Sequence, residues 1–376
     1  MGRPRQICAR RVLALLTLAL AAACQGPPEV RWHEPDAYPE RLSDWGLLAH
    51  RQAGVVLGRG VVPYEIATPL FSDHALKLRT VYLPAEGRMT YRAQDAFELP
   101  VGSIVTKTFF YPIGADAGGK AMAVAAAGWS GDPADLTPSA YRLVETRLLV
   151  RQADGWHALP YVWDGDDAYL RLTGALLPMT LAIGGQPTAL PYVVPARSEC
   201  AGCHATDHAS GRLSLIGLKA RHVNRPYPGH ADSQLATWAQ RGLLAGLPDA
   251  AAWPAAADWQ NPEATAAERA RAYLDVNCGH CHSPTGPAAT SGMHLDIHTT
   301  ASRPLGICKP PIAAGRGSGG HRYGIVPGQP DASILVYRME TRDPATRMPE
   351  TGRSVVHQAG VELVRDWIAQ LPGECV

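Results

Sequence analysis

Apolar and polar residues alternate along much of the first half of the chain. Three runs show this alternation: residues 77–83, 103–111 and 141–151. A period of two residues is typical of β-strands that bury one face. The last run places four side chains on one predicted face: Val144, Thr146, Leu148 and Val150. Prolines and Gly/Asp clusters between the runs predict turns. Residues 25–195 are therefore predicted to form a β-rich, sandwich-like domain.

The pattern changes to a helical period toward the C-terminus. Thr265 and Glu268 form a possible capping box at the start of a helix that would end near residue 278. A closing helix is predicted from four apolar residues at helical spacing: Val361, Val364, Ile368 and Leu371. Residues 261–376 are therefore predicted to be all-α, and the whole chain is predicted to be a multidomain α+β protein.

The first residues have the pattern of an export signal. Four arginines precede an apolar run, residues 12–23, that is too short to span a bilayer. The run ends in Leu-Ala-Ala-Ala-Cys24, which resembles a bacterial lipobox, so residues 1–23 are predicted to be removed and Cys24 to carry lipid. By the same resemblance, Gln25 after the cysteine suggests that the lipoprotein is sorted to the outer membrane, where it would lie in the periplasm. The alternative is ordinary cleavage near Ala23, which would release a soluble periplasmic protein.

Charge adds little to this picture. The formal net charge is +1, from 35 basic and 34 acidic residues. Such a balance gives no electrostatic case for a nucleic-acid partner or for strong binding to anionic lipid. Contact with a membrane is expected only through the lipid anchor at Cys24.

A Cys-x-x-Cys-His signature occurs twice. The first motif is Cys200, Cys203 and His204, and the second is Cys278, Cys281 and His282. This order suits covalent haem c, because each thiol adds to one vinyl group and the histidine can bind the iron. Eight cysteines and fourteen histidines in 376 residues give only about 0.006 chance matches. A zinc site would need two Cys-x-x-Cys pairs close to each other, and a thioredoxin-like redox site would need a βαβ context. We therefore predict two covalently bound haem c groups.

Two cysteines remain after the motifs, the signal peptide and Cys24 are accounted for. Cys308 and Cys375 would lie in an oxidising compartment, where we expect them to form a disulfide. The loop that it closes would contribute about 4 kcal/mol to stability on the chain-entropy estimate.

The last region, 261–376, resembles class I cytochrome c, since two terminal helices flank a haem motif. That resemblance implies a sixth iron ligand, usually methionine, from a loop shortly before the last helix. Met348 lies in such a position and is followed by proline, as in the cytochrome c ligand loop. Met339 and Met293 are the rival ligands.

The first motif lies in a less regular region, residues 196–260, which is predicted to be an abbreviated haem module. No methionine occurs between His204 and the second motif. The sixth ligand could therefore be His208, His222, His230, a methionine from elsewhere, or none. His222 is favoured, against the simpler interpretation that it is a surface histidine.

The mature chain resembles a bacterial family of dihaem c-type cytochromes. Eight segments carry the resemblance: residues 68–73, 100–109, 144–147, 159–163, 274–278, 305–311, 323–328 and 347–349. The family implies haem binding and electron transfer, and it implies no particular substrate.

Three functions follow from these features. If both irons have six ligands, the protein is an exported electron carrier between periplasmic redox proteins, without catalytic residues. If one iron has only five, the protein could be a dihaem peroxidase. A third alternative makes the β-rich domain a substrate or partner module, so that the chain is a haem-bearing subunit of an exported oxidoreductase. Electron carriage needs the fewest additional features and is the function that we predict.

Overall fold

A computed structural model describes residues 26–114, 122–123, 128–205 and 207–376. The predicted signal peptide, residues 1–23, and Cys24 lie outside these residues. No helix in the described part is long and apolar enough to cross a membrane.

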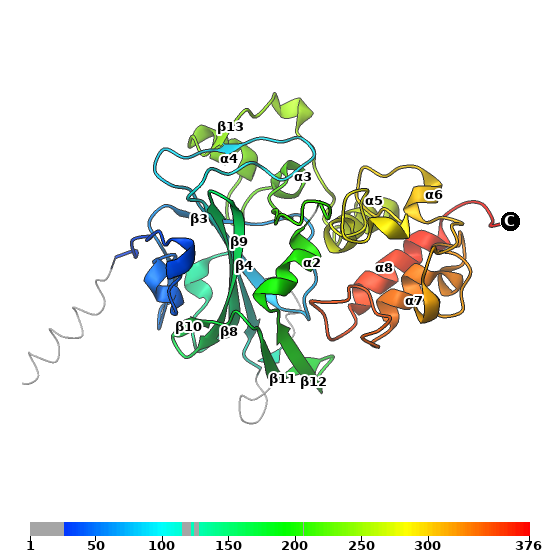
Figure 1. The fold of residues 1–376 in the computed structure, drawn as a ribbon, viewed down its shortest axis with the longest axis horizontal. Helices are drawn as coiled ribbons and strands as arrows, with labels where there is room; N and C mark the ends of the chain where they lie inside the picture. The colour runs from blue at the N-terminus through cyan, green and yellow to red at the C-terminus, as the bar shows by residue number, and fades with distance from the viewer. Residues whose placement is uncertain (1–25, 115–121, 124–127, 206) are drawn as a thin grey trace, which may run out of the picture.

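The architecture combines a β-rich region with a helical region (Figure 1). The strands are β1 (Leu48–Arg51), β2 (Gly54–Leu57), β3 (Val61–Tyr64), β4 (Leu76–Tyr82), β5 (Met89–Thr90), β6 (Ile104–Pro112), β7 (Met122–Ala123), β8 (Tyr141–Gln152), β9 (Gly155–Asp164), β10 (Asp167–Leu170), β11 (Ala175–Ile183), β12 (Gln186–Val194) and β13 (Leu244–Ala245). The α-helices are α2 (Ala201–His204), α3 (Ala220–Val223), α4 (Gln234–Gln240), α5 (Ala266–Leu274), α6 (Ser302–Leu305), α7 (Ile334–Glu340) and α8 (Gln358–Ala369). The mixed α and β content that the sequence predicts is confirmed.

The centre of the β-rich region is a six-stranded antiparallel sheet with the order β10-β9-β8-β6-β4-β3. The three alternating runs correspond to β4, β6 and β8, as predicted. The prediction that four side chains share one face of β8 is wrong at Val144. The register between β6 and β8 shifts so that Glu145 pairs with Phe109 and Leu143 with Phe110, which leaves Val144 as the extra residue of a bulge. Val144 consequently packs with Phe109 on the face opposite Leu148.

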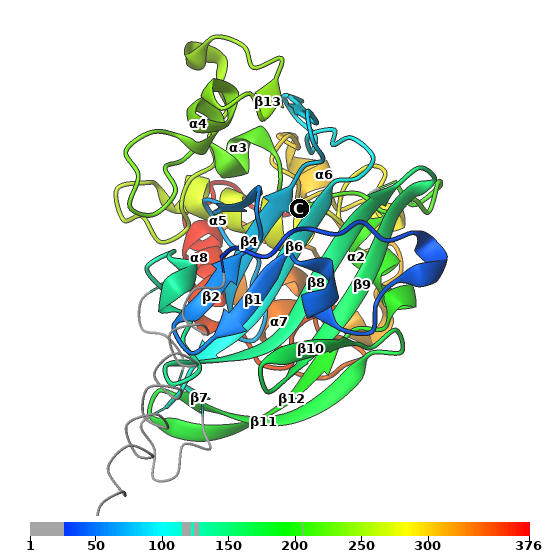
Figure 2. The same cartoon turned by 90° about the vertical axis from the view of Figure 1, so that its left-hand side faces the viewer.

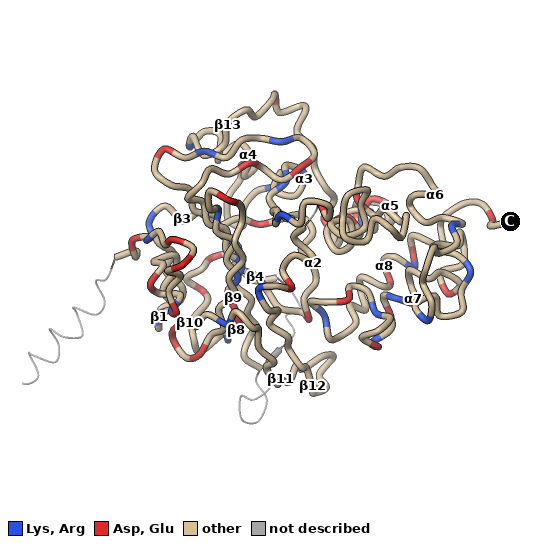
Figure 3. Tube along the Cα trace, in the orientation of Figure 1, with Lys and Arg blue, Asp and Glu red and all other residues tan. Residues whose placement is uncertain are grey.

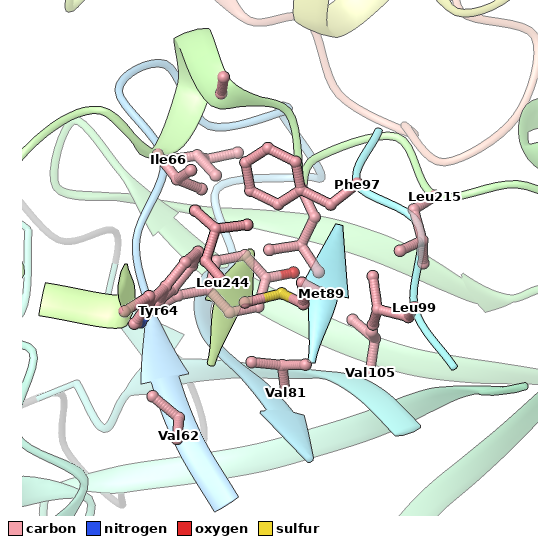
Figure 4. Close-up of a cluster of buried hydrophobic side chains, with 14 of the residues drawn as sticks. Val62, Tyr64, Ile66, Val81, Met89, Phe97, Leu99, Val105, Leu215 and Leu244 are labelled. Atoms are coloured by element: carbon pink, nitrogen blue, oxygen red, sulfur yellow. The ribbon is translucent and has the colours of Figure 1, made fainter. Parts of the chain in front are cut away.

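The two faces of the sheet are covered differently. One face packs against the N-terminal segment and the β1–β2 hairpin, which lies over the sheet in Figure 2, around the buried Trp45. The other face is covered at one end by side chains that follow the first motif, such as Leu215 and Leu244 (Figure 4). At its other end it packs against β11 and β12. The β-rich region is therefore only partly a sandwich, because helices replace the second sheet over much of this face.

Residues 196–260 share their apolar core with the sheet. Leu215 belongs to one buried cluster with Val81 and Val105 of the sheet (Figure 4). Leu235 and Trp238 of α4 belong to the same cluster. In addition, β13 pairs with β5 in parallel. The segment around the first motif is thus built onto the β-rich region and shares its stability.

The C-terminal region has its own core, to which α5, α7 and α8 contribute. The capping box is confirmed, since the Glu268 amide donates to Thr265 Oγ1 at 3.2 Å and the Thr265 amide donates to the Glu268 carboxylate at 2.9 Å. A Cβ at Gly360 would overlap the ring and hydroxyl of Tyr273, so glycine allows α8 to lie close to α5. The predicted disulfide between Cys308 and Cys375 is also confirmed, with a Cα–Cα distance of 5.2 Å.

A buried ion pair joins the two regions. Arg221 of α3 donates from Nε to Oδ2 of Asp275 at 2.8 Å and from Nη2 to Oδ1 at 3.1 Å. Both side chains are almost fully buried. Burial by itself would raise the pKa of Asp275, but the hydrogen bonds and charge of Arg221 outweigh it and lower that pKa. Asp275 lies three residues before Cys278, so this pair orients the start of the second motif.

We expect Asp275→Ala to lower the free energy of unfolding by roughly 3–5 kcal/mol at pH 7, because it leaves the Arg221 guanidinium buried and unpaired. Denaturant unfolding measures this loss. Because the folded-state pKa of Asp275 lies below 3.8, the contribution is complete near neutral pH and is lost as the pH falls through that lowered pKa. The difference between wild type and variant should therefore shrink below about pH 4.

The exposed pair between Arg365 and Asp331 is the matched control. We expect Asp331→Ala to cost less than about 1 kcal/mol, since Arg365 remains accessible to water and keeps its ion pair with Glu340. Equal costs for the two variants would contradict a structural role for the Arg221–Asp275 pair.

Candidate functional site

Each Cys-x-x-Cys-His motif follows a regular element that positions it. The first motif begins in a 3-10 turn, η4 (Arg197–Cys200), directly after β12, and continues through α2. The second begins in a π-helical turn, η6 (Asp275–Gly279), which prolongs α5. The first motif is held by the sheet and the second by a helix, and α2 lies between the sheet and the C-terminal helices (Figure 1).

Both motif histidines have the bonding pattern of metal ligands. His204 Nδ1 lies 2.8 Å from the Ser214 carbonyl oxygen, and His282 Nδ1 lies 3.3 Å from that of Met293. A neutral imidazole that donates from Nδ1 keeps the lone pair of Nε2 for a metal. Burial lowers the pKa of each histidine to about 4, so both rings are neutral at pH 7. The residues therefore suit axial ligation of iron.

A cavity of about 460 Å³ adjoins the second motif. Cys278, Cys281 and His282 line it together with Met348. Most of its other lining is apolar, as in Leu295, Ile334, Leu335 and Val361. A large apolar cavity that brings together two thiols, an imidazole and a thioether fits a covalently bound haem.

All three candidate methionines line this cavity, but their settings differ. Met339 lies within α7 and is buried in the core of the C-terminal region. Met293 packs partly buried against the same core. Met348 lies in the loop between α7 and α8, as the cytochrome c resemblance predicts. Of the three methionines, Met348 is the least involved in core packing, which favours it as the iron ligand.

The loop that carries Met348 is fixed by hydrogen bonds. The Met348 amide donates to the Arg338 carbonyl at 2.8 Å, and Arg353 Nε donates to the Met348 carbonyl at 3.0 Å. The Asp73 carboxylate, which belongs to the β-rich region, accepts the amides of Ser354 and Val355 at 2.6 and 2.9 Å. The β-rich region thus helps to hold the loop in place.

The two motifs touch each other. Cys281 Sγ donates to the Gly202 carbonyl at 3.3 Å, and the His208 amide donates to the Thr285 carbonyl at 2.8 Å. Interaction with the neighbouring Cys281 thiol, followed by that with the His280 ring, lowers the pKa of Cys203, whereas the interaction with Cys203 raises the pKa of Cys281. None of the four motif cysteines forms a disulfide. Sites that are 78 residues apart in sequence are therefore neighbours.

The sixth ligand of the first motif stays a prediction. His222 is buried, and its Nε2 lies 3.4 Å from Asp275 Oδ2, while its Nδ1 has no hydrogen-bond partner among the described residues. The interpretation of His222 as a surface histidine is wrong. His208 lies at the contact between the motifs, and His230 is exposed beside Tyr227.

Sequence reasoning missed a set of charged residues near the first motif. Lys77, Arg79, Lys107, Glu145 and Arg147 lie on the face of the sheet that is not covered by β1 and β2. The signal was present in the sequence, because charged residues two positions apart, such as Lys77 and Arg79 or Glu145 and Arg147, fall on one face of a predicted strand. It also missed His280, which lies within the second motif beside Cys203 and Cys281.

Comparisons of the chain with protein-family models, curated proteins and solved structures found no match. The interpretation of the site therefore depends on its motifs and its geometry.

We expect Met348→Ala, in protein matured with haem, to abolish the weak sulfur-to-iron absorption band near the red edge of the visible spectrum. The reason is that alanine has no donor atom to replace the thioether. Absorption of the oxidised protein measures the effect. Met339→Leu and Met293→Leu are matched controls that should keep the band. Its survival in Met348→Ala would show that another residue is the ligand.

Proposed function

We propose that this chain is an exported dihaem c-type cytochrome that carries electrons between periplasmic redox proteins. The observation that carries the proposal is the cavity at the second motif, where both thiols, the histidine and Met348 line one apolar space. The proposal includes the lipid anchor at Cys24 and a class I cytochrome c-like arrangement of residues 261–376. The first motif completes it with a second attachment site.

The chain's residues have distinct roles in this function. The thiols of Cys200, Cys203, Cys278 and Cys281 would hold two haem groups through thioether bonds. His204 and His282 would bind iron, each oriented by its backbone acceptor. Haem iron, when bound, supplies a one-electron couple between the ferric and ferrous states. Methionine at position 348 would favour the reduced state relative to a second histidine.

The contact between the motifs supports a shared function for the two sites. The Sγ atoms of Cys203 and Cys281 lie within 4.8 Å of each other, so the two attachment points lie side by side in the fold. Arg221 and Asp275 fix this arrangement at the start of the second motif. A chain that only needed two independent sites would not require them to be adjacent, whereas passage of an electron through the chain does.

A zinc site is the second candidate, because one observation favours it. The ligand atoms of Cys203, His280 and Cys281 lie within 4.8 Å of one another. Three such ligands can bind zinc with one position open. The spacing of the two Cys-x-x-Cys pairs along the chain does not predict that they meet, and the fold brings them together. Zinc at these residues would, however, explain neither the cavity nor the orientation of His204 and His282.

Mass and metal analysis should separate the two proposals. We expect protein matured with a functioning haem-attachment system to carry the mass of two haem groups, and Cys278→Ala/Cys281→Ala to carry one. The matched variant Cys200→Ala/Cys203→Ala should also carry one. Haem-free protein with stoichiometric zinc from that expression would overturn the cytochrome proposal.

Resonance spectroscopy of the resting two-haem protein separates a carrier from a peroxidase. We expect low-spin ferric signals only, since a carrier keeps both irons saturated with ligands. A high-spin ferric signal together with turnover of hydrogen peroxide would instead identify the dihaem peroxidase.

A further inference from the structure

Three cations face one another across the strands beneath the first motif. Arg79 of β4 pairs directly with Lys107 of β6, and Lys107 pairs directly with Arg147 of β8. Like charges at directly opposed positions of a sheet destabilise it. Basic and acidic residues are otherwise interspersed along the chain (Figure 3). A row of three opposed cations in a protein interior therefore calls for a counter-charge.

The carboxylates on this face only partly supply it. The Glu145 carboxylate accepts hydrogen bonds from Nε and Nη2 of Arg147, at 2.8 and 2.5 Å, and from the Tyr192 hydroxyl at 2.6 Å. Glu65 lies 3.1 Å from Arg79. These two carboxylates are engaged by the two arginines, which leaves the lysines without an acidic partner.

The lysines of this face, Lys77 and Lys107, form no ion pair with any described residue. Lys77 donates to the Ala75 carbonyl at 2.8 Å, and the Lys107 ammonium lies 5.1 Å from the centre of the Phe109 ring. Burial, followed by the charges of Arg147 and Arg79, lowers the pKa of Lys107 to about 7. Four basic side chains thus face two carboxylates, and burial also lowers the pKa of Lys77 well below its usual value.

The row lies next to the first motif. The charge of Lys107 acts on His204, and the charge of Arg147 acts on Cys200. Cys200 packs against the same apolar cluster as Val105 and Leu149, the residues that flank Lys107 and Arg147 on this face. A ligand attached at Cys200 and Cys203 would therefore lie within reach of the cations.

We propose that Arg79, Lys107 and Arg147 form a carboxylate-binding site that belongs to the first motif. The ligand is an anion with one or two carboxylate groups. One source is the pair of propionates on a haem held by Cys200 and Cys203, and this source rests on the proposed function. The other source is a free small carboxylate that enters from solvent. Arginine and lysine bind carboxylates through charge-assisted hydrogen bonds, and Glu65 and Glu145 leave Lys107 without an acidic partner of its own.

The test uses the full-length two-haem protein and the variants Lys107→Gln and Lys107→Arg. A nearby cation disfavours the ferric state, so Lys107→Gln should lower one of the two midpoint potentials and leave the other unchanged. Lys107→Arg should restore it. Arg59→Gln, which removes an exposed cation of the β-rich region outside the row, is the control and should change neither potential.

Calorimetric titration with succinate distinguishes the two sources. Saturable binding to wild type that weakens at least tenfold in Lys107→Gln identifies a free carboxylate. A shifted potential without succinate binding identifies the propionates. Two unchanged potentials together with no succinate binding would overturn the site.

A protein that carries no haem would refute the proposed function but not the carboxylate site. Thermal unfolding tests the site in that case too. If a carboxylate occupies the site, Lys107→Met should lower the melting temperature, because a paired charge is removed. If the site binds nothing, the same variant should raise it, because repulsion among the cations is relieved. In haem-free protein the measurement is made with and without succinate, and a higher melting temperature for Lys107→Met under both conditions would overturn the site.

Discussion

The arrangement of this protein depends on the buried ion pair between Arg221 and Asp275. Arg221 follows the first motif and Asp275 precedes the second, so one pair of charges sets where the second motif begins relative to the β-rich region. Burying both charges is costly, and only mutual hydrogen bonding offsets that cost. A pair of this kind tolerates little displacement, because any separation leaves two unsatisfied charges in an apolar interior. The contact between the motifs follows from this constraint.

The β-rich region acts as a support for both motifs. It supplies the core on which residues 196–260 pack, and its Asp73 holds the loop that carries Met348. The amide of Phe71 also donates to Asn277 Oδ1 at 2.8 Å, next to Cys278. Loops that carry ligands need such support, since a loose ligand would exchange with water or with a neighbouring side chain. The sheet therefore contributes to both sites through its loops and through one of its faces.

That face carries an unusual arrangement of charge. Apolar residues such as Val105 and Leu149 lie at one end, aromatic residues such as Phe109 and Tyr111 lie toward the other, and the cations lie between them. A row of this kind weakens the sheet in isolation. Strained or charged positions that reduce stability are commonly found where a protein binds something, which is the physical reason to connect the row with the first motif.

The sequence by itself determined the local features of this protein. The positions of β4, β6 and β8, the capping box of α5 and the closing helix depend on neighbouring residues, and the structure confirms them, although Leu371 lies beyond the end of α8. The Cys308–Cys375 pairing followed from counting, and the attachment motifs are contiguous in the chain. The bulge at Val144, the row of Arg79, Lys107 and Arg147, and the meeting of Cys203 with Cys281 were decided only by the tertiary structure. The physical reason is that each depends on strand register or on packing between distant segments, neither of which is encoded in the spacing of residues along one segment.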